Sequence, residues 1–153
     1  MTPTRATPRD WPAVLALTRA EFAYMDGVID PPSALHRLTL AEIERQAETG
    51  KIWAIGASPV ACVSLTTKAD ALFIGKLAVA APHRRQGHAK ALIDMANRRA
   101  TGSGLPWLEL QTRVELAANQ ATFRHLGFAE VGRTAHAGYD RPMTITFRRS
   151  VVA

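Results

Sequence analysis

A basic, glycine-containing stretch near the middle of the chain is the part of the sequence best suited to bind an anion. Arg84, Arg85 and Lys90 supply positive charge, and Gly87 lets a ligand come close to the backbone. The first turn of a helix has unpaired backbone N–H groups and a dipole that favours negative charge. If a helix begins here, the stretch predicts a pyrophosphate site. The alternative is a surface loop that is basic by chance.

The flanking residues predict a strand before this stretch and a helix after it. The short apolar run at 72–79 has the length of a strand and is interrupted by Gly75 and Lys76. Pro82 ends the run, because proline cannot donate to a sheet. From Ala89 onward apolar residues recur at helical spacing, and Gly102 is expected to end the helix. The strand–loop–helix order supports an anion site more strongly than the loop sequence does by itself.

These residues resemble the acyl-CoA-binding motif of the GNAT superfamily of N-acetyltransferases, which reads Gln/Arg-x-x-Gly-x-Gly/Ala. The stretch matches neither a P-loop nor a Rossmann turn, since Gly-Lys-Ser/Thr and Gly-x-Gly-x-x-Gly are both missing. The resemblance implies acetyl-CoA as the co-substrate and no metal. It also implies cofactor contacts from Leu77, Ala78, Val79, Arg84, Arg85, Gln86, Gly87, His88, Ala89, Lys90, Asn119 and Phe123.

A second motif, at residues 119–128, resembles another GNAT signature. Asn119 is expected near a helix start, and Gly127 is expected to end that helix with Phe128 packing back on it. The family commonly has a tyrosine, close to the thioester sulfur, where this chain has Phe123. Phenylalanine cannot donate a proton, so the resemblance leaves the general acid open.

Candidates for proton transfer therefore come from elsewhere in the chain. Tyr139 is the preferred acid, with water or Tyr24 as alternatives, because Tyr139 lies in the turn between the last two predicted strands. A thiol with a pKa of about 8.5 already leaves readily, so the acid is helpful rather than obligatory. Glu109, expected on a strand facing the cofactor, and His136 are the candidate bases. The other histidines are expected at the surface.

The segment between the first two predicted helices is the expected acceptor site. GNAT proteins commonly line the acceptor site with this region, and Tyr24, Asp26 and Asp30 are suited to a cationic amine. The alternative is a solvent-exposed loop with ordinary turn aspartates.

The whole chain predicts one α/β domain over residues 1–153 with the GNAT fold. The fold is a mixed, mostly antiparallel sheet flanked by helices and splayed between its fourth and fifth strands. A strand–helix–strand crossover makes these two strands parallel. The expected helices begin near Asp10 and Thr39 and span 87–100 and 117–126. The expected strands span 2–7, 51–57, 60–67, 71–80, 107–112, 128–137 and 143–149.

Composition limits the classes of protein that the chain can belong to. No apolar run approaches a membrane span, the N-terminus lacks an apolar secretory core, and the single cysteine, Cys62, is expected to be a buried small residue. We therefore expect a cytoplasmic protein with no membrane partner. The net charge of +6 is concentrated after residue 75. A coenzyme A phosphate site accounts for much of it, and nucleic-acid binding is less favoured because no basic stripe is interleaved with aromatics.

The function expected from the sequence is transfer of an acetyl group from acetyl-CoA to a primary amine, by direct attack in a ternary complex. The acceptor is a small molecule, peptide or protein. A non-catalytic acyl-CoA sensor is the alternative, which Phe123 favours, and a nucleic-acid-binding protein is a third. Whether the chain forms a homodimer is left open.

Overall fold

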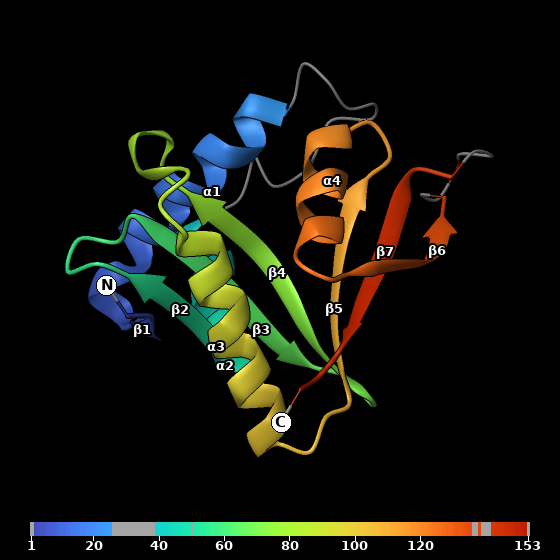
Figure 1. The fold of residues 1–153 in the computed structure, drawn as a ribbon. Helices are drawn as coiled ribbons and strands as arrows, with labels where there is room; N and C mark the ends of the chain where they lie inside the picture. Colours follow the sequence, from blue (N-terminus) through green and yellow to red (C-terminus); the bar gives the residue numbers. More distant parts are fainter. Residues whose placement is uncertain (1, 26–38, 50, 136–137, 139–141, 153) are drawn as a thin grey trace.

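A single seven-stranded sheet forms the centre of the molecule in the computed structural model (Figure 1). The structure describes residues 2–25, 39–49, 51–135, 138 and 142–152. The strands are β1 (Thr4–Arg5), β2 (Lys51–Ile55), β3 (Ala61–Thr67), β4 (Ala71–Val79), β5 (Trp107–Arg113), β6 (Ala129–Thr134) and β7 (Thr144–Ser150). The helices are α1 (Trp11–Met25), α2 (Leu40–Thr49), α3 (His88–Gly102) and α4 (Ala117–His125).

The strand order is β1-β2-β3-β4-β5-β7-β6, and every neighbouring pair is antiparallel except β4 and β5. β4 and β5 are parallel because α3 connects them as a strand–helix–strand crossover. The predicted fold, including its mixed sheet and its parallel central pair, is confirmed.

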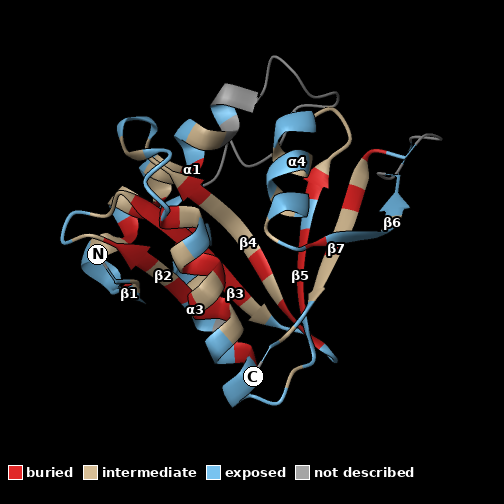
Figure 2. Ribbon diagram, in the orientation of Figure 1, coloured by how far each residue is buried: buried red, intermediate tan, exposed pale blue. Residues whose placement is uncertain are grey.

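Helices cover both faces of the sheet and create two apolar clusters. On one face, α3 packs over residues such as Val63, Ile74 and Leu108, with Ile93 contributed by the helix. On the other face, α1 and α2 pack over a smaller cluster that includes Cys62. Successive strand residues point to opposite faces, so β2, β3 and β4 each supply residues to both clusters. Figure 2 shows the buried residues along β2–β5 and β7, while β6 and much of α4 are exposed.

The helix ends follow from local sequence signals. The Thr39 hydroxyl accepts the Glu42 N–H (3.3 Å), so Thr39 caps α2 as predicted. α3 ends at Gly102, the residue expected to stop it. Gly102 lies in the last turn of α3, and the chain turns away at Gly104, where the Leu105 N–H donates to Ala100 O (3.0 Å). No helix in the described part of the chain is long and apolar enough to cross a membrane.

Candidate active site

A cleft opens where β4 and β5 separate. Their parallel pairing ends at Phe73 and Glu109, although β4 continues to Val79 and β5 to Arg113 (Figure 1). The predicted splay between the fourth and fifth strands is therefore confirmed. The cleft has a volume of about 1870 Å³. This exceeds a usual pocket for one small ligand and leaves room for two substrates.

A β-bulge in β4 lies at the start of the separation. Cys62 pairs with Ala78 and Ser64 pairs with Gly75, so β4 has one residue more than β3 between these pairs. Lys76 lies in this bulge with φ of +49°. The extra residue changes which face the following side chains point to. Consequently, Leu77 and Val79 pack on the α3 side, whereas Ala78 faces α1 and α2.

The backbone of Val79 points into the opening. The Ala80 N–H donates to Val60 O (2.8 Å), toward β3. Backbone groups of successive strand residues point to opposite edges, so the Val79 N–H and C=O point away from β3. The Arg84 Nε donates to Val79 O (3.4 Å) from the cleft side, which agrees with this direction. The Val79 N–H is therefore available to a group bound in the cleft.

The N-terminal turn of α3 faces the same cleft. Gly87 is its N-cap in a left-handed conformation (φ +82°), and no side chain caps the helix. The first intrahelical bond runs from the Ala91 N–H to Gly87 O (2.9 Å), so the amides of residues 88–90 have no partner within the helix. Apart from its chain neighbours, a Cβ at Gly87 would meet no atom of the described residues within 4 Å. The turn thus presents amides and open space, which suits a pyrophosphate.

Charged side chains surround this turn. The Arg84 guanidinium lies 2.7 Å from the Glu21 carboxylate of α1, and the Lys90 ammonium lies 2.7 Å from Asp94 one turn along α3. Arg85 is exposed and has φ of +62°. The site is therefore basic, but two of its three motif cations are already paired with carboxylates.

His88 departs from its expected surface position. It is only 8% exposed, lines the cleft, and its ring lies 6.4 Å from that of His83, which is half-buried. The His88 Nε2 is buried and has no hydrogen-bond partner among the residues that the structure describes. A buried polar atom without a partner is costly, so a ligand oxygen in the cleft would satisfy it. His125, by contrast, is exposed as expected.

The second motif borders the cleft from α4. The Asn119 side chain lies in the first turn and donates to the Thr112 hydroxyl (3.5 Å). At the other end, the Phe128 N–H donates to Phe123 O (3.0 Å), and Gly127 is left-handed, as expected for the helix stop. The Phe123 ring contacts Phe128 and Phe147 edge-on, at 6.4 and 6.1 Å between ring centres. Phe123 is thus a packing residue that also lines the cleft.

Glu109 does not face the cleft, contrary to the prediction. It lies at the last paired position of β5, is 5% exposed, and contacts Lys68 (2.7 Å) and Arg148 (2.9 Å). Burial by itself raises the pKa of a carboxyl, but the hydrogen bonds from Lys68 and Arg148 outweigh it and lower the pKa of Glu109. A carboxylate held by two cations is a weak base, so the structure gives Glu109 a structural role.

The remaining predicted site residues divide into three groups. Ala78 and Gln86 do not line the cleft, whereas the other cofactor candidates do. Tyr24 belongs to α1, but its side chain is not described. Asp26, Asp30, His136 and Tyr139 lie outside the described residues.

Glu21, Gln46 and Lys76 are among the cleft residues that the sequence reasoning missed. The only sequence signal was Lys76, a charged residue that interrupts an apolar strand. Among the described residues no group of His, Cys, Asp and Glu side chains could bind a metal ion.

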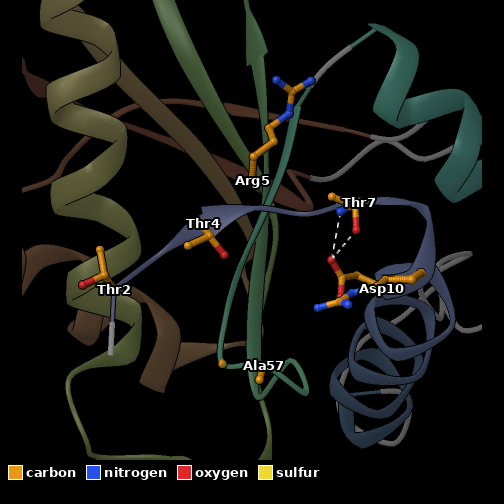
Figure 3. Close-up of a pocket in the computed structure, with 8 residues that line it drawn as sticks. Thr2, Thr4, Arg5, Thr7, Asp10 and Ala57 are labelled. Atoms are coloured by element: carbon orange, nitrogen blue, oxygen red, sulfur yellow. Dashed lines mark hydrogen bonds between the residues drawn. The ribbon is translucent and has the colours of Figure 1, made fainter.

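A second hollow, of about 600 Å³, lies beside β1 and is lined by residues such as Thr2, Thr4 and Ala57 (Figure 3). Its carboxylate, Asp10, accepts the Thr7 N–H (2.8 Å) and the Thr7 hydroxyl (3.2 Å). Arg5 extends away from Thr4, to the other side of the strand. The Asp10 carboxylate therefore caps the short 3-10 helix Pro8–Asp10, which precedes α1.

Comparisons with known proteins agree with this geometry. The model of the acetyltransferase (GNAT) family matches residues 11–128. Ard1 from Thermoplasma volcanium has a similar structure, with a TM-score of 0.79 and 16% identity over 99% of this chain and 98% of the other. The ribosomal-protein-S18-alanine N-acetyltransferase from Escherichia coli is also similar, with a TM-score of 0.71 and 18% identity over 99% and 94%. The protein smu.2055 from Streptococcus mutans has a TM-score of 0.81 and 14% identity, over 99% of this chain and 100% of the other. A comparison with curated proteins found no match.

Proposed function

Because the chain belongs to the acetyltransferase (GNAT) family, which transfers acyl groups from acyl-CoA, we propose that it acetylates a primary amine with acetyl-CoA as donor. The acceptor is a small molecule, a peptide or a protein. The one sheet that runs through the described residues supports a single acetyltransferase domain over residues 1–153.

The uncapped amides at the N-terminus of α3 carry this proposal. They face a cleft between two strands that have separated, and Arg85 and His88 border the same turn. An anion bound there would satisfy amides that otherwise have no partner within the helix, and it would also reach the buried His88 Nε2. These features fit the diphosphate of coenzyme A.

The proposed reaction is direct attack in a ternary complex. The amine nitrogen attacks the thioester carbonyl carbon, a C–N bond forms and the C–S bond breaks. The Val79 N–H stabilises the carbonyl oxygen as negative charge develops on it. The proton lost by the amine goes to His136 or to water, and the leaving sulfur takes a proton from Tyr139 or water. Tyr24, Asp26 and Asp30 are proposed to bind the acceptor.

Glu109 is not part of this proposal, because its carboxylate is held by Lys68 and Arg148.

Tyr139→Phe should lower kcat by about 10²-fold or less, since a thiol leaves without full protonation. We further propose a cytoplasmic location and no nucleic-acid partner.

A non-catalytic acyl-CoA-binding protein is a second candidate, and Phe123 is the observation that favours it. The ring packs against Phe128 and Phe147 and offers no proton to the sulfur. A sensor would bind acetyl-CoA without releasing free coenzyme A in the presence of amines.

Two measurements test these alternatives together. Acetyl-CoA should raise the Tm of the protein, and free thiol should appear when suitable amines are added. A Tm shift without thiol release across a broad amine panel would favour the sensor. No Tm shift, combined with strongly salt-dependent binding to a random duplex, would favour a nucleic-acid-binding protein.

A further inference from the structure

Lys76 is a positively charged side chain built into the cleft at the point where β4 separates from β5. It is half-buried, it lines the cleft, and it occupies the β-bulge with φ of +49°. A non-glycine residue with positive φ is uncommon in a strand. The bulge puts Lys76 on the face covered by α1 and α2, together with Ala78 rather than with Leu77.

The side chain of Lys76 is oriented by neutral groups. Its ammonium donates to the Gln46 Oε1 on α2, and the Gln46 Nε2 donates to the buried Ser64 hydroxyl (2.7 Å). These two hydrogen bonds fix the orientation of the Gln46 amide, because its oxygen must accept from Lys76 and its nitrogen must donate to Ser64. Gln46 therefore holds the Lys76 ammonium in place without neutralising it.

No carboxylate among the described residues forms an ion pair with Lys76. Burial lowers the pKa of Lys76, and this effect outweighs the charge of Glu42, which acts to raise it. Glu42 is also used at the start of α2, where it accepts the Thr39 hydroxyl (3.2 Å). Glu21, the acid of the cleft on α1, is paired with Arg84. A half-buried ammonium that has no acidic partner in the described part of the chain favours the binding of an anion.

The position of Lys76 fits the acceptor rather than coenzyme A. The α3 amides and Arg85 lie beyond the end of β4, whereas Lys76 lies three residues before Val79, about 10 Å along the strand. Its side chain also leans toward α2, on the opposite face from α3. An acceptor whose amine reaches the Val79 end of the cleft can place a second group at Lys76.

We propose that Lys76 binds a carboxylate of the acceptor, so that the acceptor is an amino acid, a peptide or another amine that carries a carboxylate. This inference rests on the proposed acetyltransferase function and narrows its acceptor class. Lys76 determines specificity in this assignment, and Gln46 positions it.

Matched acceptor pairs test the assignment. Each pair consists of an amine with a free carboxylate and its carboxamide: glycine, β-alanine and glycylglycine with their amides. Wild-type protein should favour the carboxylate by about 10- to 100-fold in kcat/KM, the range expected for a hydrogen bond between charged groups. Lys76→Met should reduce this ratio to between one and two, mainly by lowering kcat/KM for the carboxylate member of each pair. Lys76→Arg should retain most of the preference.

Lys51→Met is the matched control, since Lys51 is exposed on β2 and does not line the cleft. It should keep the wild-type ratio. Lys76→Gln serves as a second variant if Lys76→Met does not fold, and acetyl-CoA should still raise the Tm of every variant.

Two results would overturn this inference but not the proposed function. In the first, wild-type protein acetylates the acceptors with a carboxylate-to-carboxamide ratio of kcat/KM near one. In the second, Lys76→Met keeps the wild-type preference for the carboxylate. Wild-type protein that neither binds acetyl-CoA nor releases thiol with any amine would overturn the proposed function, and this inference with it.

Discussion

The Glu21 carboxylate of α1 lies 2.7 Å from the Arg84 guanidinium in the loop before α3. Arg84 also donates to Val79 O (3.4 Å), so one side chain connects α1, the end of β4 and the proposed phosphate loop. Glu21 therefore offsets part of the positive charge that the loop offers to an anion. The pair joins the helix expected to border the acceptor to the loop expected to bind the donor.

Glu21→Gln should consequently tighten coenzyme A binding. The pair is partly exposed, with side chains 18% and 42% accessible, so the neutralisation is worth about 0.2–1 kcal/mol. This corresponds to a roughly 1.5- to 5-fold lower Kd by isothermal titration calorimetry at low ionic strength. The gain should shrink as salt screens the charges. Weaker binding in the variant would mean that Glu21 matters for orienting Arg84 more than for neutralising it.

Gly87→Ala should weaken coenzyme A binding by more than its loss of folding stability explains. The left-handed φ of +82° is strained for alanine by about 1–2 kcal/mol, and the new methyl group meets no protein atom within 4 Å. The methyl group would instead project where the diphosphate must approach the α3 amides. We expect at least a tenfold higher Kd by calorimetry.

Gly104→Ala is the matched control for this change. Gly104 follows the other end of the same helix and has φ of +71°, and a methyl group added there would also meet no protein atom within 4 Å. Its thermal destabilisation should resemble that of Gly87→Ala, with coenzyme A affinity unchanged. Equal affinities for the two variants would contradict a phosphate site at Gly87.

The elements of the fold were predictable because their signals are local. The apolar alternation of 107–112 and the capping pair Thr39 and Glu42 specify structure within a few residues. The order of elements then required β4 and β5 to be parallel. The end of α3 at Gly102 was also predicted, although the left-handed residue that follows it is Gly104.

The details of the site were less predictable because they depend on residues distant in the sequence. Glu109 is neutralised by Lys68 and Arg148, each about 40 positions away in the sequence. The alternation of polar and apolar residues along β5 therefore did not reveal the role of Glu109. The bulge at Lys76 is defined by pairing with β3, which no local pattern encodes. His88 is buried beside His83 by the turn that precedes α3, although the sequence there is polar.

Glu109→Gln should destabilise the protein with little effect on catalysis. The substitution removes the negative charge between Lys68 and Arg148 at a buried position, at a cost of about 1–3 kcal/mol in urea unfolding at pH 7. Arg148 keeps its bonds to Asp70 (3.0 and 3.1 Å), which limits the loss. Because Glu109 lies outside the cleft, kcat should stay within about threefold, whereas loss of a general base would lower it 10²- to 10⁴-fold.

The stability difference between wild type and Glu109→Gln should depend on pH. The pKa of Glu109 is lowered in the folded state, so its contribution is present above the unfolded pKa and is lost as pH falls through the folded pKa. The difference should therefore narrow in acid, below about pH 4. A constant difference from pH 7 to pH 3 would show that lost packing, rather than lost charge, destabilises the variant.

Cys62 should make the protein less stable at high pH. The thiol is 1% exposed, and burial raises its pKa from 9.0 to about 12. Between these values the unfolded chain loses the thiol proton and the folded chain keeps it, so stability decreases as pH rises. The decrease from this group approaches about 1.4 kcal/mol per pH unit. Urea unfolding of wild type and Cys62→Ala between pH 8 and 11 measures it. At pH 8 the free energy of unfolding should be lower for Cys62→Ala than for wild type, because the substitution leaves a cavity. It should then decrease less steeply with pH than in wild type. Equal slopes for the two proteins would show that other groups cause the loss of stability at alkaline pH.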